Sequence, residues 1–377
     1  MDNKLKQKIA QSIALTGPMS ISQYMHLCNA HPQLGYYSTG NPVGKDGDFI
    51  TAPEVSQMFG ELIGLWCRQA WHAMNCPDRV QIVELGPGRG TMINDIIRSM
   101  KTSQKFSDAT EIRLVESSPS LKSEQQSRLA DCSIPMQWVH NIEELPPIPA
   151  IFIANEFLDA IPFRQFVKTD DSWQELCVGI HNDSEPGYNQ LTFVTGSSGL
   201  EESLLPPGHE KAPAGAIFEY APAREAITML ISQHIKSNGG IALLIDYGHE
   251  LSGFGDTFQA VQSHQPVSTL ENPGQSDLTS HVDFQAISNV ATQTGLKAGK
   301  ILTQQDFLLA LGLLERAGSL GHDKSASVQQ KIQQDVNRLA ADDQMGKLFK
   351  VLCLTQPQYP MPLFDDHTPS RQQSELI

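Results

Sequence analysis

The chain has 377 residues, with 27 Lys and Arg against 42 Asp and Glu, and a formal charge of −15 at neutral pH. Its length exceeds the usual size of a single domain, so we expect one ligand-binding core with added segments. The acidic balance and the lack of a dense Lys/Arg tract in the sequence argue against nucleic acid as a partner. An acidic surface suits a basic protein partner, but solubility alone explains the same charge.

The six cysteines are scattered along the sequence and form neither a CxxC pair nor a metal-ligand spacing. We therefore expect reduced thiols and no metal site. The beginning, MDNKLKQKIAQSIALTG, has neither the apolar core of a signal peptide nor the Arg-rich character of a transit leader, and no apolar run is long enough to span a bilayer. These features favour a bacterial cytoplasmic protein that is not inserted into a membrane.

In chain order, the pattern of residues 1–78 predicts helices around a Gly/Pro-rich loop. We expect this region to contribute to the active site. Residues 79–162 then alternate between apolar strands and helices: VQIVEL, TMINDIIRSM, EIRLVE, a further helix, MQWVH and AIFIAN. Such an alternation is typical of a parallel sheet. We expect this stretch to form the first half of a Rossmann-like core.

The remaining segments predict an insertion, the second half of the core and a helical addition. Residues 163–218 contain RQFVKT, WQELCVGI and QLTFVTG, whose alternation predicts antiparallel strands. Residues 219–303 return to the core with a helix and the strand IALLIDYG, and residues 304–345 contain two helical patterns, FLLALGLLERAG and VQQKIQQDVNRLA. Residues 346–377 supply a last core strand and a polar tail. The predicted fold class is α/β, Rossmann-like, with an antiparallel β insertion and added helical regions.

The turn ELGPGRG follows the first predicted core strand and opens a helix. Gly86, Pro87, Gly88 and Gly90 therefore lie at the carboxyl end of a strand, where backbone N–H groups bind nucleotide-like ligands. The spacing is GxGxG, whereas NAD-binding proteins use GxGxxG with an acid about 20 residues further on. Here the acid at the end of the second strand, Glu116, lies 26 residues beyond the last glycine. The turn favours S-adenosylmethionine over NAD.

Two acids near this turn are candidate cofactor ligands. The carboxylate of Glu84 suits the methionine ammonium of S-adenosylmethionine, and Glu116, followed by Ser117, suits both ribose hydroxyls. The alternative is that both acids merely end their strands. By the same topology, Asn141 and Ile142, after the third strand, are expected beside the adenine.

Candidate catalytic residues follow the later strands. Asn155, assigned to the cofactor, and Glu156 end a strand that is expected beside the first one, at the switch point of the sheet. A carboxylate there can hold a guanidinium bidentately and take up its proton. Asp159 either supplies a second carboxylate or caps a following helix. Asp246 ends another strand at the same edge.

Other polar groups are weaker candidates. His281 is a candidate catalytic group, although a lone histidine in such a position is more often structural. Glu219 and Asp283 are expected at the rim together with His281, and Tyr247 is expected to end the same strand as Asp246. The loop GKDGDFITAPE is either an active-site lid or a surface Ω-type loop, and its candidate substrate-contacting residues are Gly47, Asp48, Phe49, Thr51 and Glu54.

Several longer blocks occur in order: GYYS, GDFITAPEVSQMFGEL, VELGPGRGTM, VESSPSL, NEFLDAIPFRQF, LLIDYG, DTFQAV and DLTSHVDF. From about residue 15 to 355 the chain resembles the MidA-type protein arginine methyltransferase family, which has bacterial members and a mitochondrial member that assists respiratory complex I assembly. The resemblance implies a class I S-adenosylmethionine fold and methylation of a protein arginine. It matches the three glycines, Glu116 and the motif at Asn155 to Ala160 to family positions.

The sequence also departs from expected patterns. The family often carries an aromatic at the position of Leu158, and of the two glutamates found in well-known arginine methyltransferases only Glu156 has an obvious counterpart. The leading interpretation is an enzyme that acts on a protein, with a respiratory-chain subunit as one candidate substrate. The alternatives are an S-adenosylmethionine-binding assembly factor with little or no turnover, and a nicotinamide oxidoreductase, which would need the missing NAD spacing. The oligomeric state stays open, with a homodimer among the alternatives.

Overall fold

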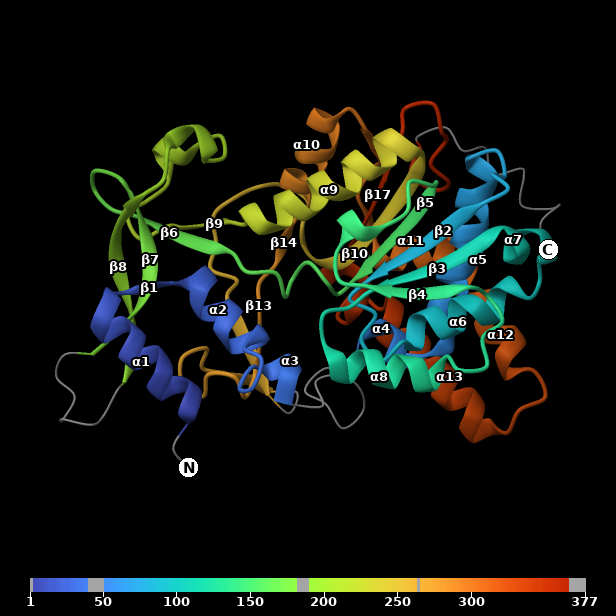
Figure 1. The fold of residues 1–377 in the computed structure, drawn as a ribbon, viewed down its shortest axis with the longest axis horizontal. Helices are drawn as coiled ribbons and strands as arrows, with labels where there is room; N and C mark the ends of the chain where they lie inside the picture. Colours follow the sequence, from blue (N-terminus) through green and yellow to red (C-terminus); the bar gives the residue numbers. More distant parts are fainter. Residues whose placement is uncertain (1–2, 40–50, 182–189, 263–264, 366–377) are drawn as a thin grey trace. The chain divides into compact units, whose positions relative to one another are not determined.

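The computed structural model of the protein describes residues 3–39, 51–181, 190–262 and 265–365. The chain forms two compact units, each assembled from three separate stretches (Figure 1). The first unit consists of residues 1–50, 158–227 and 251–283, and the second unit of residues 51–157, 228–250 and 284–377. These two units do not follow the six segments predicted from the sequence. The six segments remain a prediction about domains.

The second unit contains the predicted parallel sheet. Its strand order is β15-β17-β10-β5-β2-β3-β4, and β16 pairs with β17. Strands β10, β5, β2, β3 and β4 run parallel, whereas β17 is antiparallel to β10. The bounds are β2 Val80–Leu85, β3 Thr110–Val115, β4 Met136–Val139, β5 Ala150–Asn155, β10 Gly240–His249, β15 Lys297–Ala298, β16 Leu302–Thr303 and β17 Phe349–Thr355. Because the chain first builds β3 and β4 on one side of β2 and then β5 and β10 on the other, the carboxyl ends of β2 and β5 flank the switch point.

Helices cover both faces of this sheet, which explains why its central strands read as continuous apolar runs. On one face Ile151 and Ile153 of β5 belong to a core that also contains Trp66 of α5. On the other face Phe152 contacts His234 of α9, with ring centroids 5.4 Å apart. The helices of this unit are α4 Ala52–Val55, α5 Gln57–Ala73, α6 Thr91–Met100, α7 Gln104–Ala109, α8 Pro119–Arg128, η1 Ile142–Glu144, the later part of α9 Pro222–Asn238, α10 Phe284–Thr294, α11 Gln304–Ala310, α12 Leu313–Gly321, α13 Ala326–Ala340 and α14 Met345–Leu348.

One predicted helix is wrong in its extent. The pattern FLLALGLLERAG was expected to form a single helix, but the structure divides it between α11 and α12. Gly312 lies between them with a φ of 92°, in the left-handed region that glycine adopts without strain. The apolar periodicity continues across the break, so the sequence pattern did not reveal it.

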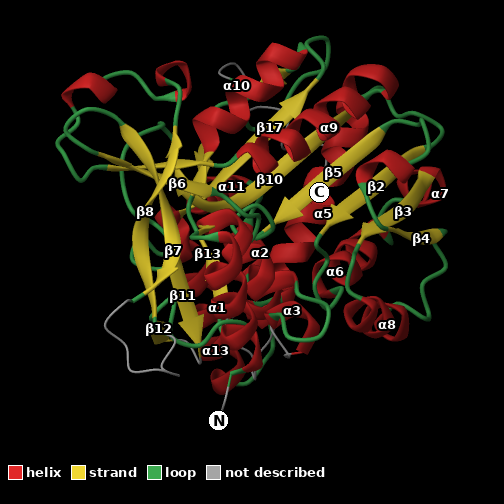
Figure 2. Ribbon diagram, turned by 60° about the vertical axis from the view of Figure 1, so that its left-hand side comes forward, coloured by secondary structure: helices red, strands yellow, loops and turns green. Residues whose placement is uncertain are grey.

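The first unit is built around two antiparallel sheets (Figure 2). One has the order β1-β7-β6-β9 with β8 paired to β7, and the other the order β12-β11-β13. This confirms the predicted antiparallel insertion, but β1 and β9 lie outside the three segments from which it was predicted. The bounds are α1 Lys4–Thr16, β1 Met19–Ser20, α2 Ile21–Ala30, α3 Tyr36–Thr39, β6 Arg164–Lys168, β7 Trp173–Ile180, β8 Leu191–Gly199, η2 Glu202–Leu204, η3 His209–Lys211, β9 Ile217–Tyr220, β11 Gln259–Gln262, β12 Gln265–Val267, β13 Asp277–Thr279 and β14 Val282–Asp283.

The α/β fold class predicted from the sequence is therefore confirmed. Within the part of the chain that the structure describes, no helix combines the length and the apolar character needed to cross a membrane.

Candidate active site

The glycine turn between β2 and α6 has the conformation that its sequence requires. Gly86, Gly88 and Gly90 all lie in the left-handed region, with φ values of 63°, 52° and 75°. A side chain at Gly86 would also collide with Phe157, whose Cδ2 atom would lie 2.7 Å from the added Cβ. Gly90 is the N-cap of α6 and brings no side chain to its first N–H groups. The turn therefore leaves backbone donors at the start of α6 for a ligand.

Glu84 lies at the carboxyl end of β2 and is only 2% exposed. Burial raises the pKa of its carboxyl group to about 8, and the nearby charge of Glu116 adds to this shift. Its Oε2 atom has no hydrogen-bond partner among the described residues. A buried acceptor without a donor costs free energy, so this carboxyl group suits a ligand that brings a positively charged donor.

Glu116, directly after β3, is linked to the glycine turn through Gln125 of α8. The side-chain nitrogen of Gln125 donates to Glu116 Oε2 at 3.1 Å and to the carbonyl oxygen of Gly88 at 2.7 Å. Ser118 N–H donates to the other carboxylate oxygen at 2.7 Å. Burial raises the pKa of Glu116, and these hydrogen bonds oppose the shift. Trp138 Nε1 donates to Gln125 Oε1 at 2.8 Å, so the whole carboxamide is fixed.

Sequence reasoning missed Gln125. The signal was available in the helix pattern, because Leu121, Gln125 and Leu129 stand four residues apart and share one face of the helical segment. A glutamine in such a row is unusual, and here it is completely buried. The one polar residue in this apolar row, Gln125, therefore binds the backbone of the glycine turn.

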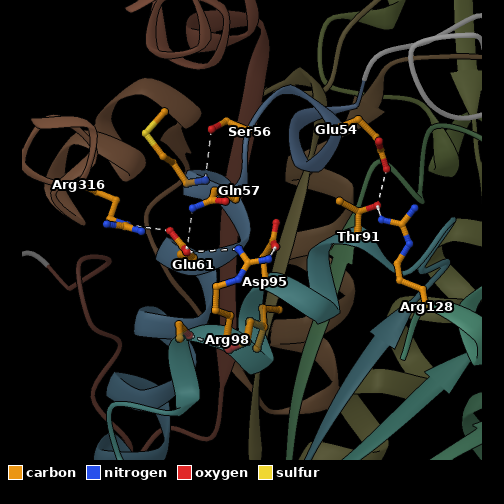
Figure 3. Close-up of polar contacts among 12 residues, drawn as sticks. Glu54, Ser56, Gln57, Glu61, Thr91, Asp95, Arg98, Arg128 and Arg316 are labelled. Carbon is orange, nitrogen blue, oxygen red and sulfur yellow. Dashed lines mark hydrogen bonds and ion pairs between the residues drawn. The ribbon is translucent and has the colours of Figure 1, made fainter. Parts of the chain in front are cut away.

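A second contact to the turn comes from α4. Glu54 accepts a hydrogen bond from the hydroxyl of Thr91, the first residue of α6, and Arg128 of α8 donates to the same hydroxyl at 2.9 Å (Figure 3). Thr51 is the N-cap of α4 but makes no side-chain capping bond. Glu54 thus contacts the first residue of α6, the helix that follows the glycine turn. The other predicted lid residues, Gly47, Asp48 and Phe49, lie outside the described residues.

The predicted adenine-side residues lie after β3 and β4. Ser117 is exposed, and its backbone hydrogen bond helps to lower the pKa of Glu116. Asn141 is the N-cap of η1, where its side chain accepts from Glu144 N–H at 3.2 Å. Ile142 is buried. Their role toward a ligand stays a prediction.

Glu156 follows the last residue of β5 with a φ of 50°, a left-handed conformation that costs a non-glycine residue free energy and is often found at functional sites. Its N–H donates to the carbonyl oxygen of Ile245 on β10 at 2.9 Å. Its Oε1 atom accepts from Ala52 N–H at 2.8 Å and from Asn155 Nδ2 at 3.1 Å. Backbone and side chain are thus both held in place at the switch point.

Asp246 of β10 supports this arrangement and is 1% exposed. One of its oxygens accepts from Phe157 N–H at 3.2 Å, and the other from Tyr247 N–H at 2.9 Å. Both described contacts of the Asp246 carboxylate are therefore with backbone N–H groups, and one of these belongs to Phe157, the residue after Glu156. Its predicted catalytic role remains a prediction.

The comparison with known proteins decides the family. Residues 62–302 match the family of S-adenosyl-L-methionine-dependent methyltransferases. The chain belongs to this family. It is 34% identical over 372 residues to the mitochondrial protein arginine methyltransferase NDUFAF7 of Danio rerio, covering 93% of this chain and 86% of that protein. The Caenorhabditis elegans homologue of NDUFAF7 is 32% identical over 378 residues, with the same two coverages.

Solved structures agree on the fold. A protein from Burkholderia thailandensis, bound to S-adenosyl-homocysteine, superimposes with a TM-score of 0.80 at 24% identity, covering 93% of this chain and 92% of that protein. A second structure from the same organism gives a TM-score of 0.76 at 23% identity. The family predicted from the sequence is confirmed, and the chain is an S-adenosylmethionine-dependent methyltransferase.

The residues of the second unit fit this cofactor. The left-handed glycines keep the turn free of side chains, and Glu84 Oε2 is a buried acceptor without a donor, as a site for the methionine ammonium requires. Glu116 presents a carboxylate that is already oriented by Gln125. These residues would hold the cofactor across the ends of β2 and β3. The contact of each residue with the cofactor is a prediction.

The two remaining catalytic candidates, Asp159 and His281, belong to the first unit. Buried Arg224 donates to the carbonyl oxygens of both, at 3.1 Å for Asp159 and 2.7 Å for His281. The alternative that Asp159 caps a following helix is wrong, because the next regular element is strand β6. Asp159 lies in a turn instead.

The structure also places the rim candidates Glu219 and Asp283 and the strand-end candidate Tyr247. Glu219 of β9 accepts from the N–H of Thr257 at 2.8 Å and from its hydroxyl at 2.5 Å, and burial raises its pKa. Asp283 ends β14, and Tyr247 lies in β10. Their roles toward a substrate stay predictions.

Proposed function

We propose that the protein methylates an arginine side chain of a protein substrate and that Glu156 holds the guanidinium. The observation that carries this proposal is the fixed carboxylate of Glu156 at the switch point, bonded by Ala52 N–H and Asn155 Nδ2. A carboxylate is the acceptor that matches the planar donor fork of a guanidinium. The residue also has a left-handed backbone, which points to a function that outweighs the strain.

The chemistry divides between cofactor and protein. When bound, S-adenosylmethionine supplies a methyl group whose C–S bond breaks, with the electron pair left on sulfur, as the C–N bond forms. The carboxylate of Glu156 binds the guanidinium, orients one nitrogen and takes up the proton that this nitrogen releases. Asp246 holds the backbone of Phe157 and so keeps the turn after Glu156 in place. Positioning and electrostatics supply most of the catalysis in this scheme.

A protein substrate is supported by the relatives, which are named protein arginine methyltransferases. The formal charge of −15 also favours a basic segment over an acidic one. The resemblance noted above makes a respiratory-chain subunit the first substrate to search for. The fixed carboxylate beside the glycine turn favours this enzyme over an assembly factor with little or no turnover.

The test uses the protein extract of a strain that lacks this chain, incubated with purified enzyme and methyl-labelled S-adenosylmethionine. We expect label on arginine, and the Glu156→Gln enzyme should lose about 10²- to 10⁴-fold in rate because both the charge and the proton acceptor are gone. Affinity for S-adenosyl-homocysteine should stay within about threefold, below the ~1.4 kcal/mol of a tenfold change. Mass spectrometry of the labelled peptides gives the result.

Glu111→Gln is the matched control, because Glu111 lies at the amino end of β3 and pairs with Arg79 and Arg113. This variant should label arginine at the wild-type rate. Label confined to lysine or to small molecules would contradict the proposal. A Glu156→Gln enzyme of unchanged rate would remove the carboxylate from the mechanism.

We also propose a reducing compartment, supported by six cysteines that are all free, four of them buried. The bacterial cytoplasm remains our prediction, while the curated relatives carry the word mitochondrial in their names. Cell fractionation tests the compartment. Light scattering tests whether the protein is a homodimer.

A further inference from the structure

Asn155, the last residue of β5, has one half of its carboxamide bonded and the other half without a partner. The side chain is buried, with 7% exposure. Its nitrogen donates to Glu156 Oε1 at 3.1 Å. Its oxygen, Oδ1, has no hydrogen-bond partner among the described residues. A buried carbonyl oxygen in this state costs free energy until a donor arrives.

The orientation of this carboxamide follows from the chemistry of its neighbour. An ionised carboxylate only accepts hydrogen bonds, so the amide nitrogen of Asn155 must face Glu156. The amide oxygen must then point to the other side. The contact with Glu156 therefore fixes the plane of the carboxamide and leaves its oxygen as an acceptor for a group that the described residues do not supply.

Another buried asparagine, Asn29, has both halves of its carboxamide bonded within the fold. Asn29, in the first unit, is 3% exposed. Its nitrogen donates to the carbonyl oxygen of Leu278 at 2.8 Å, and its oxygen accepts from Leu278 N–H at 3.3 Å. Both halves are used within the fold. Asn155 differs from Asn29 in that its oxygen is left over. The buried Gln81 and Gln304 also have an oxygen without a partner, but their nitrogens bond backbone carbonyl oxygens, whereas the nitrogen of Asn155 bonds a carboxylate.

The place of Asn155 in the sheet indicates which ligand this oxygen serves. The cofactor-side acids lie at the ends of β2 and β3, with Glu84 in the former and Glu116 directly after the latter. Asn155 lies on the other side of the switch point, on β5, and is paired in register with Ile245 of β10. Its own nitrogen is bonded to Glu156. Asn155 thus belongs to the same side as the carboxylate proposed to bind the methyl acceptor.

We propose that Asn155 Oδ1 accepts a hydrogen bond from the nitrogen that becomes methylated, and so shares the positioning of that nitrogen with Glu156. The inference rests on the proposed function and replaces the earlier assignment of Asn155 to the cofactor. A terminal guanidinium nitrogen carries two N–H groups in one plane. With one N–H on Glu156 and the other on Asn155, that plane is held and its face stays open for attack on the methyl carbon. The amide oxygen takes up no proton, so proton uptake stays with Glu156.

The first test removes the acceptor. In Asn155→Ala, the rate of arginine labelling at saturating S-adenosylmethionine should fall about 10- to 100-fold, the size of a lost positioning contact. Affinity for S-adenosyl-homocysteine, measured by calorimetry, should stay within about threefold of wild type, well under a tenfold change of ~1.4 kcal/mol. A rate within twofold of wild type would overturn the inference. A loss of cofactor affinity parallel to the loss of rate would also overturn it and return Asn155 to the cofactor.

Asn29→Ala is the matched control for truncating a buried carboxamide. It should lower the melting temperature, because two backbone groups of Leu278 lose their partner. Its labelling rate per folded enzyme should stay near wild type. If Asn155→Ala lost rate only in proportion to its folded fraction, as a structural role requires, the inference would fail.

The second test uses Asn155→Asp, because a protonated aspartic acid reproduces both the donor and the acceptor of asparagine. Its O–H can donate to Glu156 while its carbonyl oxygen accepts. As the pH rises, the new group ionises, loses its donor and repels the Glu156 carboxylate. We expect the rate of this variant relative to wild type to fall with rising pH. Glu84 and Asp246, on the flanking strands, are present in both proteins, so the ratio changes only through the new carboxyl group and its coupling to them. A ratio that does not change with pH contradicts the inference.

The two proposals fail in different ways. If wild-type enzyme labels lysine instead of arginine, the proposed function fails, and the same Asn155 variants are then judged by their rates on lysine. If wild-type enzyme labels arginine and both Asn155 variants behave like wild type, only the Asn155 inference fails.

Discussion

Glu84 illustrates how a single residue links cofactor binding to pH. Its carboxyl group is buried at the end of β2, and burial, with the charge of Glu116, raises its pKa to about 8. The folded protein therefore keeps a proton on this group between about pH 4.5 and 8, whereas the unfolded chain has lost it. The free energy of unfolding falls as the pH rises through that interval. A ligand ammonium offsets this loss, because it favours the ionised carboxylate.

The first prediction concerns Glu84→Gln, which removes this titration. Relative to wild type, the variant should gain stability as the pH rises from 5 to 8, by up to about 3–4 kcal/mol, since each pH unit in this interval corresponds to about 1.4 kcal/mol. Urea unfolding at pH 5, 6.5 and 8 measures the difference. The variant should also bind S-adenosylmethionine more weakly at pH 8, where about half of the wild-type carboxyl groups are already ionised. Parallel stability curves for the two proteins would contradict the assigned protonation.

At the scale of the elements, a buried carboxylate joins three helices of the second unit. Glu61 of α5 is 8% exposed and accepts from Arg316 of α12 at 2.7 Å and from Arg98 of α6 at 3.4 Å (Figure 3). Arg98 also pairs with Asp95 on its own helix at 2.8 Å. Because α6 begins at the glycine turn, Glu61 ties the helix that opens the cofactor site to the C-terminal helices.

The second prediction is that Glu61→Gln lowers the free energy of unfolding by about 1–3 kcal/mol, because Arg316 loses its charged partner, Arg98 keeps only Asp95, and the Glu61 side chain is mostly buried. Chemical denaturation gives the value. Lys331→Ala is the matched control, since the Lys331–Asp335 pair lies on one helix with its lysine side chain 60% exposed. That change should cost no more than about 0.5 kcal/mol. Equal costs for the two variants would show that Glu61 does not join the helices energetically.

At the scale of the whole molecule, the chain enters and leaves each unit several times, yet the glycine turn, Glu84, Glu116 and Glu156 all belong to the second unit. A cofactor bound by these residues acts on that unit directly. Ligand at 100 times its dissociation constant stabilises the state that binds it by about 2.7 kcal/mol. This stabilisation extends to the first unit only as far as the two units are coupled energetically.

The third prediction follows from this division. Adding S-adenosyl-homocysteine should slow hydrogen exchange in residues 80–90 and 110–125, and should change strands β6 to β9 much less. Exchange measured by mass spectrometry with and without ligand resolves these segments. Gly88→Val is the control, because a β-branched residue is strained at a φ of 52° and its side chain would intrude on the turn, so the protection should disappear. Ligand protection confined to β6–β9 would contradict the proposed site.

Local sequence patterns predicted much of the fold and the place of the ligand site. The continuous apolar runs VQIVEL and AIFIAN predicted buried parallel strands, and the glycine turn predicted where a ligand would bind. The position of Glu156 at the sheet edge also followed, because the ends of parallel strands lie at one edge whatever the rest of the chain does. These features depend on neighbours within a few residues, so the sequence carried them.

Contacts between distant residues were decided only in three dimensions. The N–H of Ala52 reaches Glu156 across 104 positions, and Arg316 reaches Glu61 across 255. The unused oxygen of Asn155 could not be recognised before its nitrogen was seen on Glu156. Periodicity reports which face of an element is buried, but the partner of a buried polar group is set by how the elements pack. The sequence by itself therefore determined the strands, the turn and the family, while the tertiary structure decided which polar groups meet and which acceptors are left for a ligand.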